Sequence, residues 1–186
     1  SSTENTLEAL LYAKFNLITL ANNHILDHNE KGLLNTLKLC DRKNIDYIGA
    51  GGDLTDAKKY KIFELKGKKI GFINACEHEF SIATNSSAGA NPLDEIQLFY
   101  AVQDLKNQCD VIILIAHGGI EFHNYPSPDL KKKAHYYVDL GVDAVVYHHS
   151  HVICGYEVFK GKPIFYGIGN FIFDRDTPTK EWYKGI

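Results

Sequence analysis

The feature that most restricts the fold of this chain is a strand–helix–strand pattern in its second half. Residues 110–116 (DVIILIA) form an apolar run of strand length, and residues 143–147 (DAVVY) form another. A helix is expected between them, over residues 128–140. Strands that are connected through a helix can lie parallel in one sheet, whereas a tight turn would make them antiparallel. The pattern therefore predicts an α/β protein with a parallel strand pair.

The remainder of the chain continues the alternation of helices and strands. We expect helices over residues 3–14, 29–44 and 93–108, and strands over residues 15–21 and 45–52. Two hairpins are expected where polar turns divide alternating runs, over residues 60–76 around KGKK and over residues 156–173 around KGKP. Residues 77–92 carry no such pattern, and a loop of that length is usually functional.

The composition excludes several classes of function. With 186 residues, 45% hydrophobic residues and a net charge of -3, the chain is expected to be one ordinary globular domain. Its Lys and Arg residues are scattered, so no nucleic-acid partner is expected. The longest apolar run, residues 111–116, is too short to span a membrane. The four cysteines are far apart without a CxxC pair, which favours buried free thiols.

Polar and imidazole side chains follow three of the predicted strands, at residues 15–21, 110–116 and 143–147. They are Asn22, Asn23, His24, His117, His148, His149 and His151. In open α/β sheets, ligands gather beyond the carboxyl ends of the strands. Neutral imidazole combined with amide or carboxylate oxygen suits Zn, Mn or Fe. The shared placement therefore predicts a divalent-metal site.

Within HHSH, His149 and His151 are the expected ligand pair. In an extended H-x-H segment their side chains project to the same side, which leaves His148 facing away as a packing residue. Taken singly, His24 is better explained as a satisfied polar residue at a helix start, and His117 as an ordinary strand-end histidine. A plainer alternative for the whole set is that the histidines are structural remnants.

Four segments resemble, in order and spacing, the CapA family of poly-γ-glutamate capsule biosynthesis proteins, which is similar in turn to calcineurin-like metallophosphoesterases. The segments are LANNHILDHNEKGLLNTL (20–37), HGGIEF (117–122), VDAVVYHHSHV (142–152) and GKPIFYGIGNFIFD (161–174). The resemblance covers residues 5–175. It implies a four-layer α/β/β/α sandwich, here a single domain over residues 1–186, with a two-metal centre at the sheet edge.

The resemblance also implies roles for single residues. Asn23, through its amide oxygen, and His117 would bind the same metal, and His149 and His151 would supply one ligand to each metal. His24 would protonate a leaving oxygen or stabilise transition-state charge.

Three further residues resemble family positions near the site. Asp27 is expected to orient His24 rather than to bind metal. Asn170 and Asp174, in GNFIFD, are weaker candidates for the wall of the site.

One part of the family pattern is missing. The family begins with a strand that ends in Gly-Asp and continues to an Asn-x-Glu-like element, and neither precedes Asn22 here. We therefore expect the natural N-terminus, at least one strand and the acidic ligands to lie upstream of Ser1. Two divalent ions need anionic ligands between them. The full-length protein is thus expected to hold two divalent metals (Mn, Zn or Fe), and this chain at most one tightly.

The resemblance implies a capsule or poly-γ-glutamate biosynthesis protein with a metal-dependent hydrolase centre of the phosphoesterase type. The alternative is a non-catalytic component of envelope assembly that keeps the fold and binds an anionic polymer. The expected partners are an anionic small molecule or polymer, phosphoester or polyglutamate-like, and other capsule-assembly proteins. The expected location is the bacterial cell envelope, with any anchor upstream of this chain.

Overall fold

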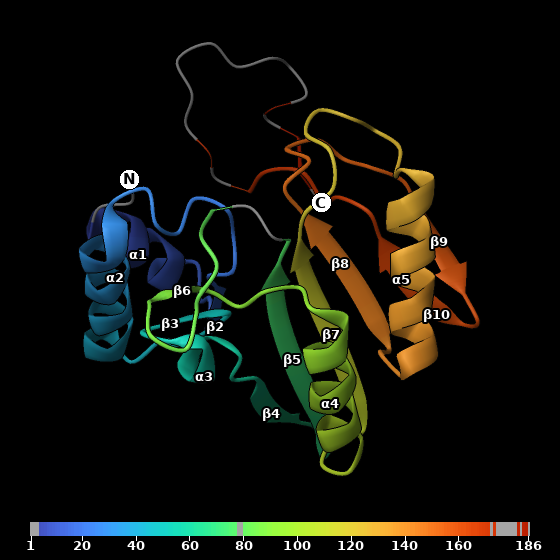
Figure 1. Cartoon of the computed structure of the whole chain (residues 1–186), viewed down its shortest axis with the longest axis horizontal. Coiled ribbons are helices and arrows are strands. Elements are labelled where there is room, and N and C mark those ends of the chain that lie inside the picture. Colours follow the sequence, from blue (N-terminus) through green and yellow to red (C-terminus); the bar gives the residue numbers. More distant parts are fainter. Residues whose placement is uncertain (1–3, 78–79, 172, 174–181, 183, 186) are drawn as a thin grey trace. The chain divides into compact units, whose positions relative to one another are not determined.

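The computed structural model describes residues 4–77, 80–171, 173, 182, 184 and 185 (Figure 1). The chain forms two compact units, and each is described by itself. Unit 1 comprises Ser1–Tyr60 and Asn74–Leu93, and unit 2 comprises Lys61–Ile73 and Asp94–Ile186. Among the described residues, no helix combines the length and the apolar character that crossing a bilayer requires.

The described residues of unit 1 form three helices and two small sheets. Its helices are α1 (Glu4–Tyr12), α2 (Asn29–Lys43) and α3 (Leu54–Ala57). Strand β1 (Leu17–Thr19) pairs in parallel with β2 (Asp46–Ile48), and β3 (Ala50–Gly51) pairs antiparallel with β6 (Gly89–Ala90). Helix α2 buries Leu33, Leu37 and Cys40, which share one face at helical spacing. This face packs on Leu20 and Ala50, so it supports the segment that follows β1.

Unit 2 is built on a six-stranded mixed sheet with the order β4-β5-β7-β8-β10-β9. Its strands are β4 (Lys61–Leu65), β5 (Lys68–Cys76, of which the last residues belong to unit 1), β7 (Val111–His117), β8 (Ala144–His148), β9 (Tyr156–Phe159) and β10 (Lys162–Phe165). Strands β7, β8 and β10 are parallel, whereas β4 and β9 are antiparallel to their neighbours. Helix α4 (Glu95–Lys106) packs on β7, and α5 (Pro128–Leu140) packs on β8.

Helix α5 has distinct signals at both ends. The Ser127 hydroxyl accepts a hydrogen bond from the backbone N–H of Leu130 at 3.1 Å, and Pro128 occupies the first turn. Gly141 ends the helix with a left-handed φ of 117°. The chain then enters β8, so the local sequence fixes both ends of the crossover between β7 and β8.

The α/β class, the parallel pair and both hairpins predicted from the sequence are confirmed. The single strand expected over residues 45–52 is wrong. Gly49 adopts a φ of 89° and divides this segment into β2 and β3, which belong to different sheets. A loop is expected over residues 77–92. Within the described part of this range, the only strand is β6.

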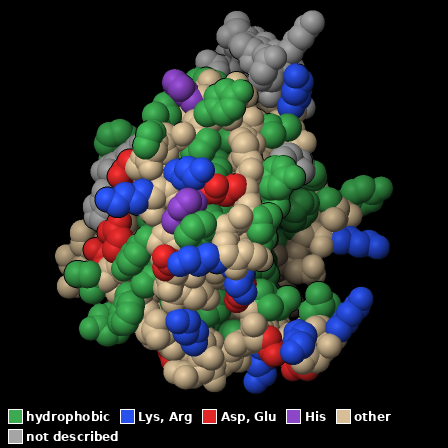
Figure 2. All heavy atoms as spheres, turned by 90° about the vertical axis from the view of Figure 1, so that its right-hand side faces the viewer, with side chains coloured by type: hydrophobic (Ala, Val, Ile, Leu, Met, Phe, Trp, Pro, Cys, Tyr) green, Lys and Arg blue, Asp and Glu red, His purple; other side chains and the backbone are tan. Residues whose placement is uncertain are grey.

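On the face that carries α5 and β9, basic and acidic side chains are interspersed (Figure 2). Glu157 accepts hydrogen bonds from Tyr166 at 2.6 Å and His135 at 2.5 Å, and it pairs with Lys131 at 3.0 Å. Burial opposes the ionisation of Glu157, but these contacts outweigh it and hold the pKa of its carboxyl at about 2. The contacts of Glu157 therefore join β9 to α5. Lys131 is already engaged in an ion pair with Glu157.

A buried asparagine fixes the backbone that leads into the Asn22–His24 segment. Asn74 is 2% exposed, and its Oδ1 accepts a hydrogen bond from the backbone N–H of Ala21 at 2.7 Å. Asn91 in turn donates to the carbonyl oxygen of Asn74 at 2.9 Å. A Cβ at Gly49 would lie 2.0 Å from Asn74 Oδ1 and 2.8 Å from the Cβ of Ala21. Only glycine fits there, because the position is both left-handed and crowded.

We predict that Gly49→Ala lowers the melting temperature more than Gly67→Ala does. Gly67 has a similar φ of 74°, but no atom lies within 4 Å of the place that a Cβ would occupy, so it is the matched control for backbone strain. Backbone strain should lower the free energy of unfolding of each variant by about 1–2 kcal/mol. Overpacking should lower that of Gly49→Ala by about 1–3 kcal/mol more. Thermal unfolding followed by circular dichroism measures the difference. Equal melting temperatures would contradict the close packing around Asn74.

Candidate metal centre

The pairing of β7 with β8 brings two of the predicted histidine segments to one sheet edge. The register of this parallel pair ends with His117 opposite His148, so both strands end at the same level. The backbone N–H of Gly118 also donates to the carbonyl oxygen of His148, at 3.3 Å. Residues that follow the two strands are therefore neighbours, although the whole of α5 lies between them in the sequence.

His149 and His151 both have left-handed backbone conformations. Their φ angles are 95° and 58°, which residues other than glycine rarely adopt. Such strain costs of the order of 1–3 kcal/mol per residue and gathers at functional sites. The extended H-x-H geometry predicted from the sequence is therefore wrong. The two rings still lie near each other, with centroids 6.4 Å apart, because the chain turns sharply after β8.

His149 turns toward the end of the neighbouring strand. Its ring centroid lies 4.9 Å from that of His117, with the ring planes tilted by 58°. His148, the last residue of β8, is different, because burial lowers the pKa of its imidazole and favours the neutral form. The packing role predicted for His148 stays a prediction.

Asn170 fixes the tautomer of His151. The Nδ2 of Asn170 donates to the carbonyl oxygens of Trp182 (3.0 Å) and His151 (3.4 Å), so the oxygen end of the amide must face the imidazole. Asn170 Oδ1 lies 2.9 Å from His151 Nδ1 and can only accept, so Nδ1 carries the proton. The Nε2 of the neutral ring is therefore an acceptor, which is the state that a metal ligand needs.

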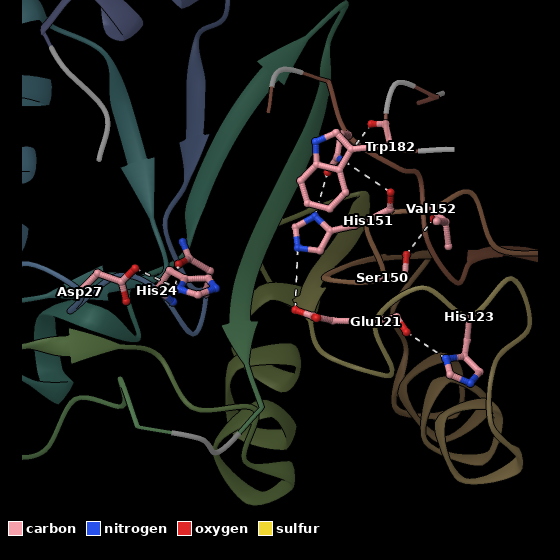
Figure 3. Close-up of polar contacts among 10 residues, drawn as sticks. His24, Asp27, Glu121, His123, Ser150, His151, Val152 and Trp182 are labelled. Carbon is pink, nitrogen blue, oxygen red and sulfur yellow. Dashed lines mark hydrogen bonds and ion pairs between the residues drawn. The ribbon is translucent and has the colours of Figure 1, made fainter. Parts of the chain in front are cut away.

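Aromatic rings surround His151. Its ring stacks on Trp182 with centroids 4.7 Å apart and on Phe122 at 5.9 Å, while the ring of Phe173 meets it edge-on at 5.0 Å. Only 13% of the His151 side chain is exposed, and one of its ring nitrogens points toward Glu121 (Figure 3). The Oε1 of Glu121 lies 3.9 Å from His151 Nε2. His151 is thus held in one orientation, with one nitrogen directed toward a carboxylate.

In unit 1, Asp27 contacts His24. The Nδ1 of His24 lies 3.0 Å from Asp27 Oδ2, and the backbone N–H of His24 donates to Asn22 Oδ1 at 2.9 Å. The hydroxyl of Ser81 donates to the carbonyl oxygen of Asn23 at 2.6 Å. These bonds fix the turn, and more than half of each of the His24 and Asp27 side chains is exposed. The roles predicted for Asn23, His24 and Asp27 stay predictions.

The structure thus brings His117, His149, His151 and Asn170 together in unit 2, and His24 with Asp27 in unit 1. Asp174 lies outside the described residues. Across the part of the chain that the structure describes, no three His, Cys, Asp or Glu side chains are grouped closely enough to hold an ion as they stand. The donors of unit 2 instead form neighbouring pairs, and their chemistry, imidazole with carboxylate, fits Zn, Mn or Fe.

Sequence reasoning missed Glu121, Ser81 and Trp182. The only signal for Glu121 was an acidic residue four positions after His117, within HGGIEF. Ser81 lies in the long irregular segment, which was expected to be functional without any residue being named. Nothing in the sequence pattern points to Trp182.

Comparison with known proteins identifies relatives of this chain. The model of the bacterial capsule synthesis protein family PGA_cap matches residues 1–175. The capsule biosynthesis protein CapA of Bacillus anthracis is 36% identical over 190 residues, which cover 97% of this chain and 46% of that protein. The PGA biosynthesis protein CapA of Bacillus subtilis is 31% identical over 183 residues, which cover 96% and 48%. The chain therefore spans about half the length of these relatives.

Solved structures with a similar fold include phosphatases. A phosphatase from Mycoplasma pneumoniae matches with a TM-score of 0.58 and 19% identity, covering 90% of this chain and 55% of that one. A putative 5'-nucleotidase from Staphylococcus aureus matches with a TM-score of 0.59 and 18% identity, covering 91% and 38%. At such identities the likeness shows the fold alone, and it confirms the predicted metallophosphoesterase-like fold. By its match over nearly the whole sequence, the chain belongs to the bacterial capsule synthesis protein family PGA_cap.

Proposed function

We propose that this chain carries the histidine ligands of a metal-dependent hydrolase centre of the phosphoesterase type, in a protein of capsule or poly-γ-glutamate biosynthesis. The observation that carries the proposal is the His117–His149 pair. Its ring centroids lie 4.9 Å apart at the ends of two adjacent parallel strands, and the backbone of His149 is strained. Rings at this separation can each place one nitrogen about 2.0–2.1 Å from a common ion.

The chemistry of the donors supports a divalent ion such as Mn, Zn or Fe. When bound, such an ion polarises a phosphoryl group and lowers the pKa of a coordinated water to about 7. His151 adds a third imidazole, which Asn170 holds with Nε2 as the acceptor. In the full-length protein we expect two metals, as the resemblance to metallophosphoesterases implies.

His24 is proposed as the general acid for the leaving group. Its contact with Asp27 engages Nδ1, so a protonated ring presents its Nε2–H to a neighbouring oxygen. The ring is well exposed, which leaves it accessible to a substrate. Asp27 therefore orients a proton donor, in a pattern typical of catalytic His–carboxylate pairs.

We predict that the full-length protein hydrolyses a generic phosphodiester, bis(p-nitrophenyl) phosphate, only when Mn²⁺ or Zn²⁺ is added. His149→Ala should abolish this activity, because it removes a ligand. His24→Ala should lower kcat by about 10²–10⁴-fold, as expected for loss of a general acid. His28→Ala is the matched control, because His28 is exposed and its side chain makes no capping bond at the start of α2.

Failure of the wild-type protein to turn over any phosphodiester with added metal would contradict the proposed activity. The names of the relatives indicate the rival outcome, since they describe capsule and polymer synthesis rather than hydrolysis. Binding of polyglutamate that persists in His149→Ala, without turnover in wild type, would favour a non-catalytic polymer-binding component.

We also predict that Asn170→Ala weakens metal binding by about 10–100-fold, which is typical for loss of a group that orients a ligand. Binding of Zn²⁺ or Mn²⁺ can be followed through Trp182, the single tryptophan, because its ring stacks on His151. Asn124→Ala is the control, since Asn124 donates to the carbonyl oxygen of Ile153 in the same unit. An unchanged dissociation constant for Asn170→Ala would show that the tautomer of His151 does not matter for binding.

A further inference from the structure

Two backbone hydrogen bonds fasten the loop that carries Glu121 to the HHSH turn. Gly118 donates to the carbonyl oxygen of His148 at 3.3 Å, and Phe122 donates to that of Ser150 at 2.8 Å. Phe122 has a left-handed φ of 60°. The backbone on either side of Glu121 is thus tied to the segment that presents His149 and His151. The approach of the Glu121 carboxylate to His151 follows from this arrangement of the main chain.

When the His151 ring is neutral, the facing atoms of Glu121 and His151 are both hydrogen-bond acceptors. Asn170 holds the proton of His151 on Nδ1, so the Nε2 of the neutral ring presents a lone pair. The carboxylate of Glu121 also offers only lone pairs. Two acceptors that face each other in a site walled by aromatic rings repel unless a hydrogen-bond donor such as water, or a cation, lies between them. Among cations, the candidates are a proton and a metal ion.

The separation of the two atoms favours a metal ion. A proton shared between imidazole and carboxylate draws the heavy atoms to about 2.7–2.9 Å, whereas Glu121 Oε1 and His151 Nε2 are 3.9 Å apart. Two donor atoms about 2.1 Å from one tetrahedral ion lie about 3.4 Å apart. Because 42% of the Glu121 side chain is exposed, this side chain is free to rotate. A small rotation shortens the distance between Oε1 and Nε2 to the value of about 3.4 Å expected for two ligands of one ion.

We propose that Glu121 is a direct carboxylate ligand of the divalent ion that His151 binds, and so supplies an anionic donor from within this chain. This inference rests on the proposed metal centre. It changes the expectation from the sequence that every acidic ligand lies outside this chain. The charge of Glu121 offsets part of the charge of the ion, so unit 2 holds an ion more tightly than imidazoles alone would.

The test is a titration of the protein with Zn²⁺ and with Mn²⁺, followed through the emission of Trp182 and checked by calorimetry. We expect Glu121→Gln to weaken binding by about 100-fold or more, beyond the 10–100-fold that loss of an orienting group costs. Glu121→Asp keeps the charge and should recover part of the affinity. Asp129→Asn is the matched control, because Asp129 is an exposed carboxylate of the same unit that pairs with Lys133 at 3.2 Å.

An unchanged or tighter dissociation constant for Glu121→Gln would overturn the inference, because it would show that Glu121 only pairs with protonated His151. Absence of metal binding in the wild-type protein would overturn it as well. Circular dichroism of each variant, with the partial recovery in Glu121→Asp, separates loss of a ligand from loss of the fold.

A parallel assay of phosphodiester hydrolysis separates the two proposals. Turnover in wild type with undiminished metal affinity in Glu121→Gln would contradict only the role of Glu121. Tight metal binding that Glu121→Gln weakens, without turnover in wild type, would contradict only the hydrolase.

Discussion

The parallel pairing of β7 with β8 is the interaction on which the candidate centre depends. Its register ends with His117 opposite His148, so the two chain segments leave the sheet at one level. Side chains at the centre of the sheet hold this register, because Leu114 and Val145 are opposite each other and fully buried. A slip of one residue would turn these side chains out of the core and separate His117 from His149. The core thus sets the geometry of the histidines.

The turn after β8 stores backbone strain where the proposed ligands lie. His149 and His151 are left-handed, and His151 is enclosed by Trp182, Phe122 and the amide of Asn170. A sequence selected for stability alone would place glycine at such positions. Histidines occupy these positions instead, and the ring of His151 is held in a single tautomer. Both facts agree with selection for metal ligands. Glu121 fits the same explanation, since it offers negative charge beside the imidazole of His151.

Much of the fold could be predicted from the sequence, because it rests on local patterns. The apolar runs at 110–116 and 143–147 and the polar turns of the hairpins each specify an element by themselves. The break at Gly49 could not be predicted, because its cause is the buried side chain of Asn74, far away in sequence. Placement of the histidines after strands was visible, but the left-handed turn was not, since HHSH contains no glycine to mark it. Glu121 escaped notice because its approach to His151 depends on two backbone hydrogen bonds between segments that are distant in sequence.

The most direct test of the proposed centre is an anomalous X-ray difference map from crystals of the protein saturated with Zn²⁺ or Mn²⁺, recorded at the absorption edge of the metal. We expect a peak about 2.0–2.2 Å from imidazole nitrogens of the His117, His149 and His151 group. A map from a metal-saturated crystal with no peak at these three histidines would contradict the central claim.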